Sequence, residues 1–402
     1  MLSVIVPIYN GREYVRKCIN SILCQEYVDM EVICVDDGSC DDSLQIITES
    51  AQADSRIRVI HKNKNEGLVA ARKTGVNAAK GEYTAYVDCD DWIEQNMFYN
   101  MMSIAVEYDV DIVTSGTIYE GEISNTVYDG FDEGLYEGDK LDNLKSQIFF
   151  SHRKYEEGIR SNLVNKIYRT DLLRDIQNSI PNSVSYGEDR VCSLKYLLNA
   201  KSVYVLHRSY YHYIVRKQSM SCGGNPYYLD QVGFLYRELL EIICGTVYEK
   251  ELKKQCGMYI MRLLMKGIND NLGIVPKDVI WLHPSWIDGI PVGSKIVLYG
   301  CGRRGRTYYR QIKNDSSHKI EIVAWVDKNY KNINDLPVEI VSPEMVTKLD
   351  YDYIVVSIEN NKIYSEITEW LSNKGVNPYK VLRPMPKDTF WEFAESAGLY
   401  LE

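Results

Sequence analysis

Four short polar segments in the first ninety residues carry side chains suited to ligand binding. PIYN (7–10), VDDGS (35–39) and DCDD (88–91) each end a run of apolar, β-branched residues. NEGL (65–68), followed by Arg72, opens a helical pattern. Because ligands bind at the carboxyl ends of the strands in open α/β sheets, we expect the four segments to share one site.

Three of these segments offer contacts that suit a nucleotide. Tyr9 presents a flat ring on which a base can stack, an interaction worth about 1–3 kcal/mol. Asp37 can accept the imide N–H of uracil. Gly67 lets the backbone approach a ligand at a helix start, and Arg72 supplies a forked donor for phosphate or base oxygens.

The fourth segment places three carboxylates, those of Asp88, Asp90 and Asp91, within four residues. Such crowding of like charge is unfavourable unless a cation resolves it. Mg²⁺ and Mn²⁺ take oxygen ligands from one or two carboxylates together with substrate phosphates. Each segment alone also has an ordinary explanation as a strand end, a helix cap or a solvated turn. Their joint occurrence in this order favours a nucleotide and metal site.

The elements that must position these residues alternate along the chain. We expect strands at 3–9, 31–37, 57–62, 83–91 and 110–116, with helices at 12–26, 41–53, 67–80 and 94–107. Strands that alternate with helices indicate an α/β domain with a mainly parallel sheet. Residues 120–185 are more irregular, and they are followed by a helical pattern at 187–200 and a tyrosine-rich strand at 202–216.

The remaining sequence predicts a helical connector and a second domain. Residues 226–272 have a helical pattern, and 273–293, with three prolines, reads as a linker. A second α/β unit then begins with KIVLYG, and a short terminal helix is expected from about 386. The predicted domains are therefore 1–225, 226–290 and 291–402.

Residues 1–225 resemble glycosyltransferase family 2, inverting enzymes of the GT-A fold that build bacterial surface polysaccharides. The resemblance implies a nucleotide-sugar site and a divalent cation, Mn²⁺ or Mg²⁺. The residues implied to contact the nucleotide sugar are Pro7, Tyr9, Asn10, Asp37, Gly67, Arg72, Asp88 and Cys89. The implied metal ligands are Asp90 and Asp88. One departure is Lys73, which stands where the family's arginine motif usually has asparagine.

The resemblance also implies a catalytic base. SYGED (185–189) matches the family's acidic pair, Glu188 and Asp189, at a helix start. Asp189 would accept the proton of the acceptor hydroxyl as that oxygen attacks the anomeric carbon. A helix N-terminus stabilises negative charge, so Asp189 is expected to be ionised. The alternative is an acidic pair that merely begins a helix. Residues 162–168 resemble the family's stretch near the acceptor pocket.

Residues 212–221 resemble the segment that closes over the diphosphate in this family. Arg216 and Ser219 would bind the leaving phosphates, and the implied reaction is a single displacement with inversion. His212 would complete the metal shell, although a histidine beside tyrosines is more often packed than liganded.

The second α/β unit carries a dinucleotide fingerprint. Gly300, Gly302 and Gly305 follow a strand in GxGxxG spacing, and Asp327 ends the next strand about 20 residues further on. The helix start would hold a pyrophosphate and Asp327 a ribose diol. The unit resembles the small Rossmann-like domains beside sugar-modifying modules, so docking or assembly is the alternative to binding NAD or another nucleotide.

Composition excludes several classes of protein. The chain of 402 residues has 46 basic and 56 acidic side chains and a net charge of -10, which argues against nucleic-acid binding. The ten cysteines lack CxxC spacing, which indicates a reducing cytoplasm and no zinc site. The first residues do not form a signal peptide, and no apolar run reaches the roughly 20 residues of a membrane span.

The sequence therefore predicts a cytoplasmic transferase, at the inner face of the membrane at most, that moves a hexose-type sugar from a UDP donor to a glycan or lipid-linked acceptor. Two alternatives stay open: a bifunctional protein whose second domain does redox or epimerising chemistry, and a non-catalytic scaffold of glycan assembly. The partly basic helix at 251–268 could contact a membrane or a partner, and homo-oligomers are compatible with the sequence.

Overall fold

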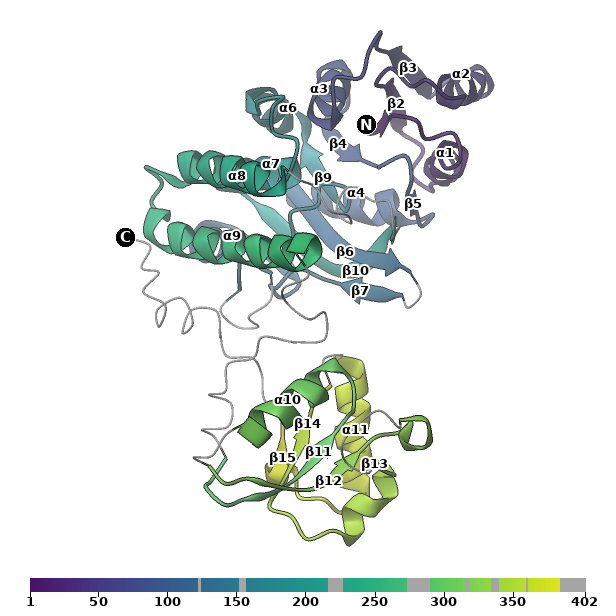
Figure 1. Cartoon of the computed structure of the whole chain (residues 1–402). Coiled ribbons are helices and arrows are strands. Elements are labelled where there is room, and N and C mark those ends of the chain that lie inside the picture. The colour runs from purple at the N-terminus through teal and green to yellow at the C-terminus, as the bar shows by residue number, and fades with distance from the viewer. Residues whose placement is uncertain are drawn as a thin grey trace. The chain divides into compact units, whose positions relative to one another are not determined.

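A computed structural model describes residues 1–121, 124–151, 157–215, 227–272, 290–314, 318–333, 340–358 and 361–383 (Figure 1). Contacts divide the chain into two compact units, Met1–Asn271 and Leu272–Glu402. The helices expected as a connector lie in the first unit, where they pack as described below. The predicted linker at 273–289 and the terminal helix fall outside the described residues.

Four parallel strands form the first half of the larger sheet, in the order β3-β2-β1-β4. They are β1 (Leu2–Ile8), β2 (Met30–Asp36), β3 (Ile57–His61) and β4 (Tyr83–Tyr86). Every residue of β1 is buried, since helices cover both faces of this part of the sheet. The α/β class and the mainly parallel sheet are confirmed.

Helices alternate with these strands as predicted. They are α1 (Val15–Leu23), α2 (Ser43–Ala53), α3 (Leu68–Ala78) and α4 (Met97–Tyr108). On one face α3 comes so close to β1 that a Cβ on Gly75 would lie 2.3 Å from Ile5 Cγ2. On the opposite face Tyr83 donates its hydroxyl to Ala105 O of α4 at 3.1 Å.

The second half of the sheet is mixed, because β9 (Lys166–Arg169) runs antiparallel between β4 and β6 (Ile112–Glu120). Beyond β6 lie β10 (Val203–Ile214), parallel to β6, and β5 (Trp92–Ile93), antiparallel to β10. Two short strands, β7 (Asn125–Val127) and β8 (Gly134–Tyr136), pair with β6 and β10. The sequence did not predict β9, because it lies in the irregular stretch 120–185.

The described residues of the first unit form five further helices. They are α5 (Gly138–Lys145), α6 (Thr170–Ser179), α7 (Glu188–Asn199), α8 (Tyr228–Ile243) and α9 (Glu249–Leu272). Gly245, with a φ of +80°, lies in the turn that separates α8 from α9. Among the described helices, none combines the length and apolar character that crossing a membrane requires.

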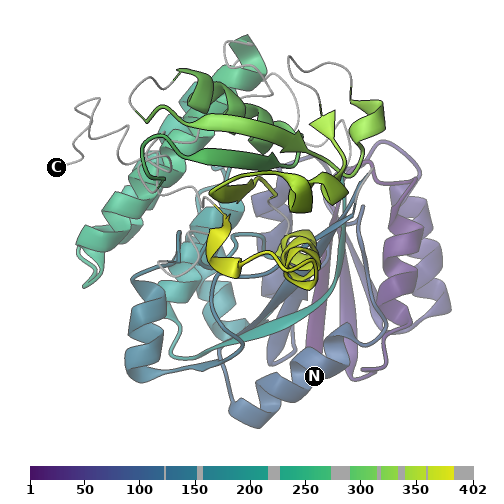
Figure 2. The same ribbon diagram turned by 90° about the horizontal axis from the view of Figure 1, so that it is seen from below.

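The described residues of the second unit form a five-stranded sheet in the order β13-β12-β11-β14-β15, with all neighbouring strands parallel. Its strands are β11 (Lys295–Tyr299), β12 (Glu321–Val326), β13 (Ile340–Val341), β14 (Tyr353–Val356) and β15 (Val381–Leu382). Helix α10 (Arg303–Asn314) packs on one face through Tyr308, and α11 (Asn361–Asn373) packs on the other through Leu371. Figure 2 shows the yellow helix α11 on its side of this sheet.

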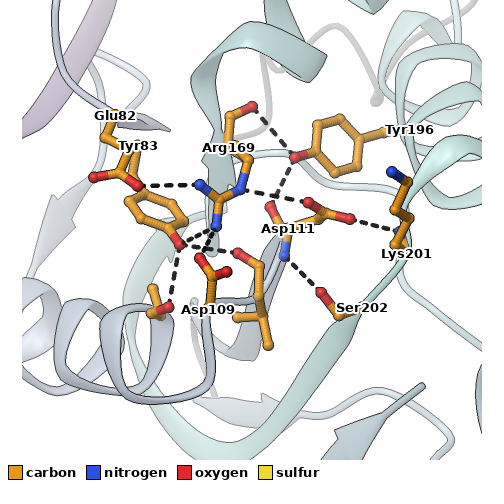
Figure 3. A network of polar contacts seen from close by, with 10 residues as sticks. Glu82, Tyr83, Asp109, Asp111, Arg169, Tyr196, Lys201 and Ser202 are labelled. Carbon is orange, nitrogen blue, oxygen red and sulfur yellow. Dashed lines mark hydrogen bonds and ion pairs between the residues drawn. The ribbon is translucent and has the colours of Figure 1, made fainter.

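Arg169, at the end of β9, fixes the antiparallel strand to its neighbours (Figure 3). Its guanidinium pairs with Glu82 at 3.0 Å, Asp109 at 2.6 Å and Asp111 at 3.4 Å. The same group lies 5.0 Å from the ring centroid of Tyr83. Arg169 therefore connects segments that precede β4 and β6, at the edge of the sheet opposite the polar segments.

Replacement of Arg169 by Gln should lower the free energy of unfolding by about 1–2 kcal/mol, because a forked donor is lost while its acceptors remain. Two of these carboxylates, Glu82 and Asp109, are largely exposed to solvent, which keeps the loss modest. Urea titration of the full-length protein followed by circular dichroism measures it. Lys201→Ala is the control, since Lys201 joins this network through its backbone N–H to Asp111. Equal midpoints for Arg169→Gln and wild type would contradict this role.

Candidate active site

Arg72 lies at the centre of the site and is 1% exposed on α3. Its guanidinium pairs with Asp189 of α7, and it lies 3.4 Å from Asp88 Oδ1 and 3.7 Å from Glu188 Oε1. The guanidinium carbon also lies 5.3 Å from the ring centroid of Tyr86. The sequence predicted that Arg72 contacts the nucleotide. The structure shows that it joins the acidic segment after β4 to the acidic pair that begins α7.

Burial and the neighbouring carboxylates shift the pKa values of the acidic groups around Arg72 in one direction, and the Arg72 charge shifts them in the other. Burial and the neighbouring Asp189 raise the pKa of Glu188 to about 8, although Arg72 acts in the other direction. Burial, Asp189 and Asp90 raise the pKa of Asp88 to about 6, again against Arg72. Despite its burial, Arg72 keeps a pKa well above the usual value because the carboxylates surround it. This clustering is typical of functional sites.

The turn after β4 is held by Tyr211 of β10. The Tyr211 hydroxyl accepts from Asp88 N at 3.1 Å and donates to Asp91 Oδ2 at 2.8 Å. Asp91 also accepts from Ile214 N at 2.9 Å and is 3% exposed, and burial raises its pKa to about 8. Asp91 therefore stabilises the turn in which the predicted ligands Asp88 and Asp90 lie.

The segment after β1 presents an aromatic ring. Tyr9 is 48% exposed, whereas Pro7 lies buried within β1 opposite Val35. Asn10 has a φ of +52°, and its side chain accepts from Cys40 N at 2.9 Å. The turn therefore leaves the tyrosine ring accessible, and Asn10 acts in the structure by joining two loops.

Asp37 organises the turn that leads into α3. Its carboxylate accepts from Gly67 N at 2.7 Å and from Glu66 N at 3.1 Å. Gly67 has a φ of +91°, so a glycine suits this position. Lys62 Nζ lies 2.6 Å from Asp37 Oδ1 and 2.8 Å from Glu66 Oε2, and these ion pairs raise the pKa of Lys62 against the effect of burial.

His212 is engaged by two glutamates. Its Nδ1 lies 2.7 Å from Glu120 Oε1 and its Nε2 lies 3.4 Å from Glu94 Oε1. The ring stacks on Trp92 at 3.6 Å between centroids. Both ring nitrogens therefore face glutamates, which agrees with the packed alternative more than with a role as a metal ligand.

The oxygen donors after β4 fit a hard divalent cation. Asp88 and Asp90 repel one another, which contributes to the raised pKa of Asp88, and a cation would relieve this repulsion. Within the described residues no group of three or more His, Cys, Asp or Glu could by itself hold a metal ion. Such an ion would therefore need donor phosphates as further ligands, as Mg²⁺ commonly does.

The remaining residues of the predicted segments are Cys89, Lys166, Arg216 and Ser219. Cys89 is partly buried, its pKa is raised by burial, and its Sγ would lie 3.0 Å from a Cβ on Gly11. Lys166 is fully buried in the predicted acceptor stretch, donates to Asn162 O at 2.6 Å, and has a pKa lowered by burial to about 8. Arg216 and Ser219 lie outside the described residues.

Lys62, Tyr211 and Tyr86 were missed by the sequence analysis. Lys62 lies four residues before Glu66, a spacing that could have suggested an ion pair. Tyr211 and Tyr86 carry no such signal, because their partners are distant in the chain. Tyr211 of β10 contacts the turn after β4, and Tyr86 of β4 contacts Arg72 of α3.

The glycine-rich turn of the second unit is explained in part by packing. Gly300 has a φ of +102°, and a Cβ on Gly305 would lie 2.0 Å from Gly300 O. At Gly302 a Cβ would meet nothing within 4 Å. Asp327 accepts from Cys301 N and from Asn329 N, both at 2.7 Å. Its carboxylate therefore closes the turn, and nucleotide binding here stays a prediction.

Comparison with known families matches the two units separately. Residues 3–160 match the model of Glycosyl transferase family 2, and residues 292–382 match the family described as C2185-like, N-terminal. The first match runs from β1 past α5 and includes Arg72 and Asp88, and it ends before Asp189.

Curated relatives are glycosyltransferases by name. The chain is 35% identical over 267 residues to Glycosyltransferase GlyA of Streptococcus pneumoniae, covering 64% of this chain and 36% of that protein. It is 31% identical over 221 residues to Putative glycosyltransferase EpsH of Bacillus subtilis, covering 54% and 62%. The chain thus spans between about a third and three fifths of the length of these relatives.

The chain also shares its fold with a solved glycosyltransferase. The structure of TarS residues 1–349 from Staphylococcus aureus in complex with UDP-GlcNAc aligns with a TM-score of 0.53 and 24% identity, over 72% of this chain and 79% of that chain. TarS is a poly(ribitol-phosphate) beta-N-acetylglucosaminyltransferase. The predicted GT-A architecture is confirmed.

Glu188→Gln should stabilise the protein at high pH. The folded-state pKa of Glu188, about 8, lies above its ordinary value of 4.5, so ionisation costs the wild type stability as pH rises from about 4.5 to 8. We expect equal stability at pH 4.5 and a gain of about 1–3 kcal/mol for the variant at pH 8.5. Urea unfolding at both pH values measures it, with exposed Glu13→Gln as control. A difference independent of pH would contradict the assignment.

Proposed function

We propose that the first unit is an inverting glycosyltransferase that moves a sugar from a nucleotide-sugar donor to an acceptor hydroxyl. The observation that carries this proposal is the pairing of Arg72 with both Asp88 and Asp189. It brings the acidic segment expected at the donor diphosphate next to the expected base. The family match of residues 3–160 and the names of the relatives support the same activity.

Asp189 is the proposed base. Its side chain is 26% exposed, so it can reach an acceptor while Arg72 fixes its position and balances its charge. The carboxylate accepts the proton of the acceptor hydroxyl as the oxygen attacks the anomeric carbon from the face opposite the leaving diphosphate. Glu188, with its pKa of about 8, can stay protonated beside Asp189 and limit the charge repulsion. No covalent intermediate is required.

The donor is proposed to be a UDP-sugar. The exposed ring of Tyr9 can stack on the base. Asp37 is 3% exposed and already accepts from the backbone N–H groups of Glu66 and Gly67 beside Lys62, so its expected contact with uracil rests on the family resemblance alone. The expected contacts of Arg216 and Ser219 with the phosphates belong to this proposal. The TarS complexes with UDP and UDP-GlcNAc support it by analogy of fold.

Asp88 and Asp90 are proposed to hold a divalent cation together with the donor diphosphate. When bound, Mn²⁺ or Mg²⁺ would neutralise the charge of the departing nucleoside diphosphate. Tyr211 keeps both carboxylates at this position by fixing the turn on either side of them.

The biological role is proposed to be the synthesis of a surface glycan in the cytoplasm, on a glycan or lipid-linked acceptor. Two relatives support the glycan: TarS and a Poly(ribitol-phosphate) beta-glucosyltransferase of Bacillus spizizenii, which is 26% identical over 221 residues. All nine cysteines in the described residues are free thiols, which fits a reducing compartment.

The second unit is proposed to be a Rossmann-like module. Its parallel strands follow the order of the dinucleotide-binding folds, with the first strand at the centre. The open space at Gly302 would admit a phosphate, but Asp327 is already occupied by two backbone N–H groups. A redox or epimerising activity therefore has less support than sugar transfer.

Nucleotide release from a panel of UDP-, GDP-, dTDP- and CDP-sugars tests the proposal. We expect the full-length protein to release UDP in the presence of Mn²⁺ and to lose at least about 100-fold in rate with EDTA or in Asp90→Ala, since charge stabilisation at a leaving group is worth several kcal/mol. Calorimetry with Mn²⁺ and UDP should show weaker metal binding by that variant. Undiminished turnover of Asp90→Ala would refute the assignment of Asp90.

Asp189→Asn tests the base. The amide keeps the shape but cannot accept the proton, so we expect transfer to fall by about 10²–10⁴-fold. The donor dissociation constant, measured by calorimetry, should stay within about threefold of wild type, because Asp189 acts on the acceptor. A parallel loss of donor affinity would mean that the residue is structural.

A further inference from the structure

Helices α8 and α9 contact the segment that carries the proposed base, on both sides of Glu188 and Asp189. In Figure 1 helix α8 lies beside α7. The sequence predicted α8 and α9 to be a connector to the second unit. Their contacts instead converge on residues 185–190, which are the last residues of the loop and the first turn of α7.

The first contact is a chain of hydroxyl groups. Tyr228 of α8 donates to Leu263 O of α9 at 2.9 Å. The Tyr186 and Tyr228 hydroxyl oxygens lie 3.2 Å apart. Because each hydroxyl has a single hydrogen and that of Tyr228 is directed to Leu263, Tyr186 is the donor of the second bond. This relay ties the residue three positions before Asp189 to both helices.

The second contact is steric. Gly187, with a φ of +74°, is the residue before α7, and a Cβ there would lie 2.5 Å from Leu235 Cδ2 of α8. Leu235 is fully buried. A side chain at position 187 would therefore force the Leu235 side chain to shift, and the glycine lets Leu235 pack directly on the start of α7.

The third contact is made by Arg190, the residue after the proposed base. Arg190 is 1% exposed, pairs with Glu157, and donates to Ile159 O at 3.2 Å. Its guanidinium carbon lies 5.2 Å from the ring centroid of Phe149 and 4.8 Å from that of Tyr259 on α9. A buried cation held between two rings and an acid has little freedom to move.

We propose that α8 and α9 form a brace that positions Asp189 for catalysis, with Tyr186, Tyr228 and Arg190 as its positioning residues. The proposal rests on Asp189 being the base. Arg72 fixes the carboxylate from the side of the sheet, and the brace fixes the backbone from the side of the helices. A shift of about 1 Å in such a group can lower a rate by about 10²-fold.

The test compares Tyr186→Phe, Tyr228→Phe and the double variant in the full-length protein. We expect each single change to lower kcat of transfer about five- to tenfold while the donor dissociation constant stays within about twofold. Because both changes break the same relay, the double variant should be no slower than the slower single variant. Hydrogen exchange at the amides of residues 185–191 should be faster in all three.

Tyr236→Phe is the matched control, because it makes the same chemical change on α8 at a hydroxyl that takes no part in the contacts above. It should keep the wild-type kcat and exchange rates. Wild-type kcat or wild-type exchange in both single variants would overturn the brace, as would multiplied effects in the double variant. Failure of the proposed function gives a different result: the wild type releases no nucleotide, or Asp189→Asn transfers sugar at the wild-type rate. In that case the hydrogen-exchange rates alone decide whether the brace exists.

Discussion

The buried ion cluster around Arg72 is the constraint on which the site depends. A guanidinium with 1% exposure must be paired, and here its partners come from two distant acidic segments. Asp88 follows β4 and Asp189 lies in the first turn of α7, so the Arg72 guanidinium fixes the distance between these two acidic segments. Without the positive charge of Arg72, the carboxylates of Asp88, Glu188 and Asp189 would repel one another in a partly buried site.

Those surrounding elements divide the task. Tyr211 of β10 holds the turn that presents Asp88, and Asp37 holds the start of α3, the helix that carries Arg72. Helices α8 and α9 hold the start of α7. Because these contacts come from different parts of the first unit, the arrangement of the charged side chains depends on the whole fold and not on one loop.

The second unit is organised independently, around its own two-sided sheet. Its glycine-rich turn shows that one spacing can have two causes. Gly300 and Gly305 are required by backbone conformation and close packing, while only Gly302 faces space that a ligand could fill. A fingerprint in a sequence therefore predicts a turn more securely than it predicts a ligand.

The sequence by itself determined the alternation of strands and helices in residues 1–120 and the positions of the polar segments at strand ends, since both follow from local patterns of apolar residues. It also predicted Asp88, Asp189 and Arg72 as site residues, and the structure places these three side chains together. Only the tertiary structure decided that Arg72 pairs with Asp189, 117 positions away in the chain. The same holds for β9 in the middle of the sheet and for α8 and α9 as part of the first unit. Contacts of this kind depend on how distant elements pack, and a single chain carries no local pattern that records them.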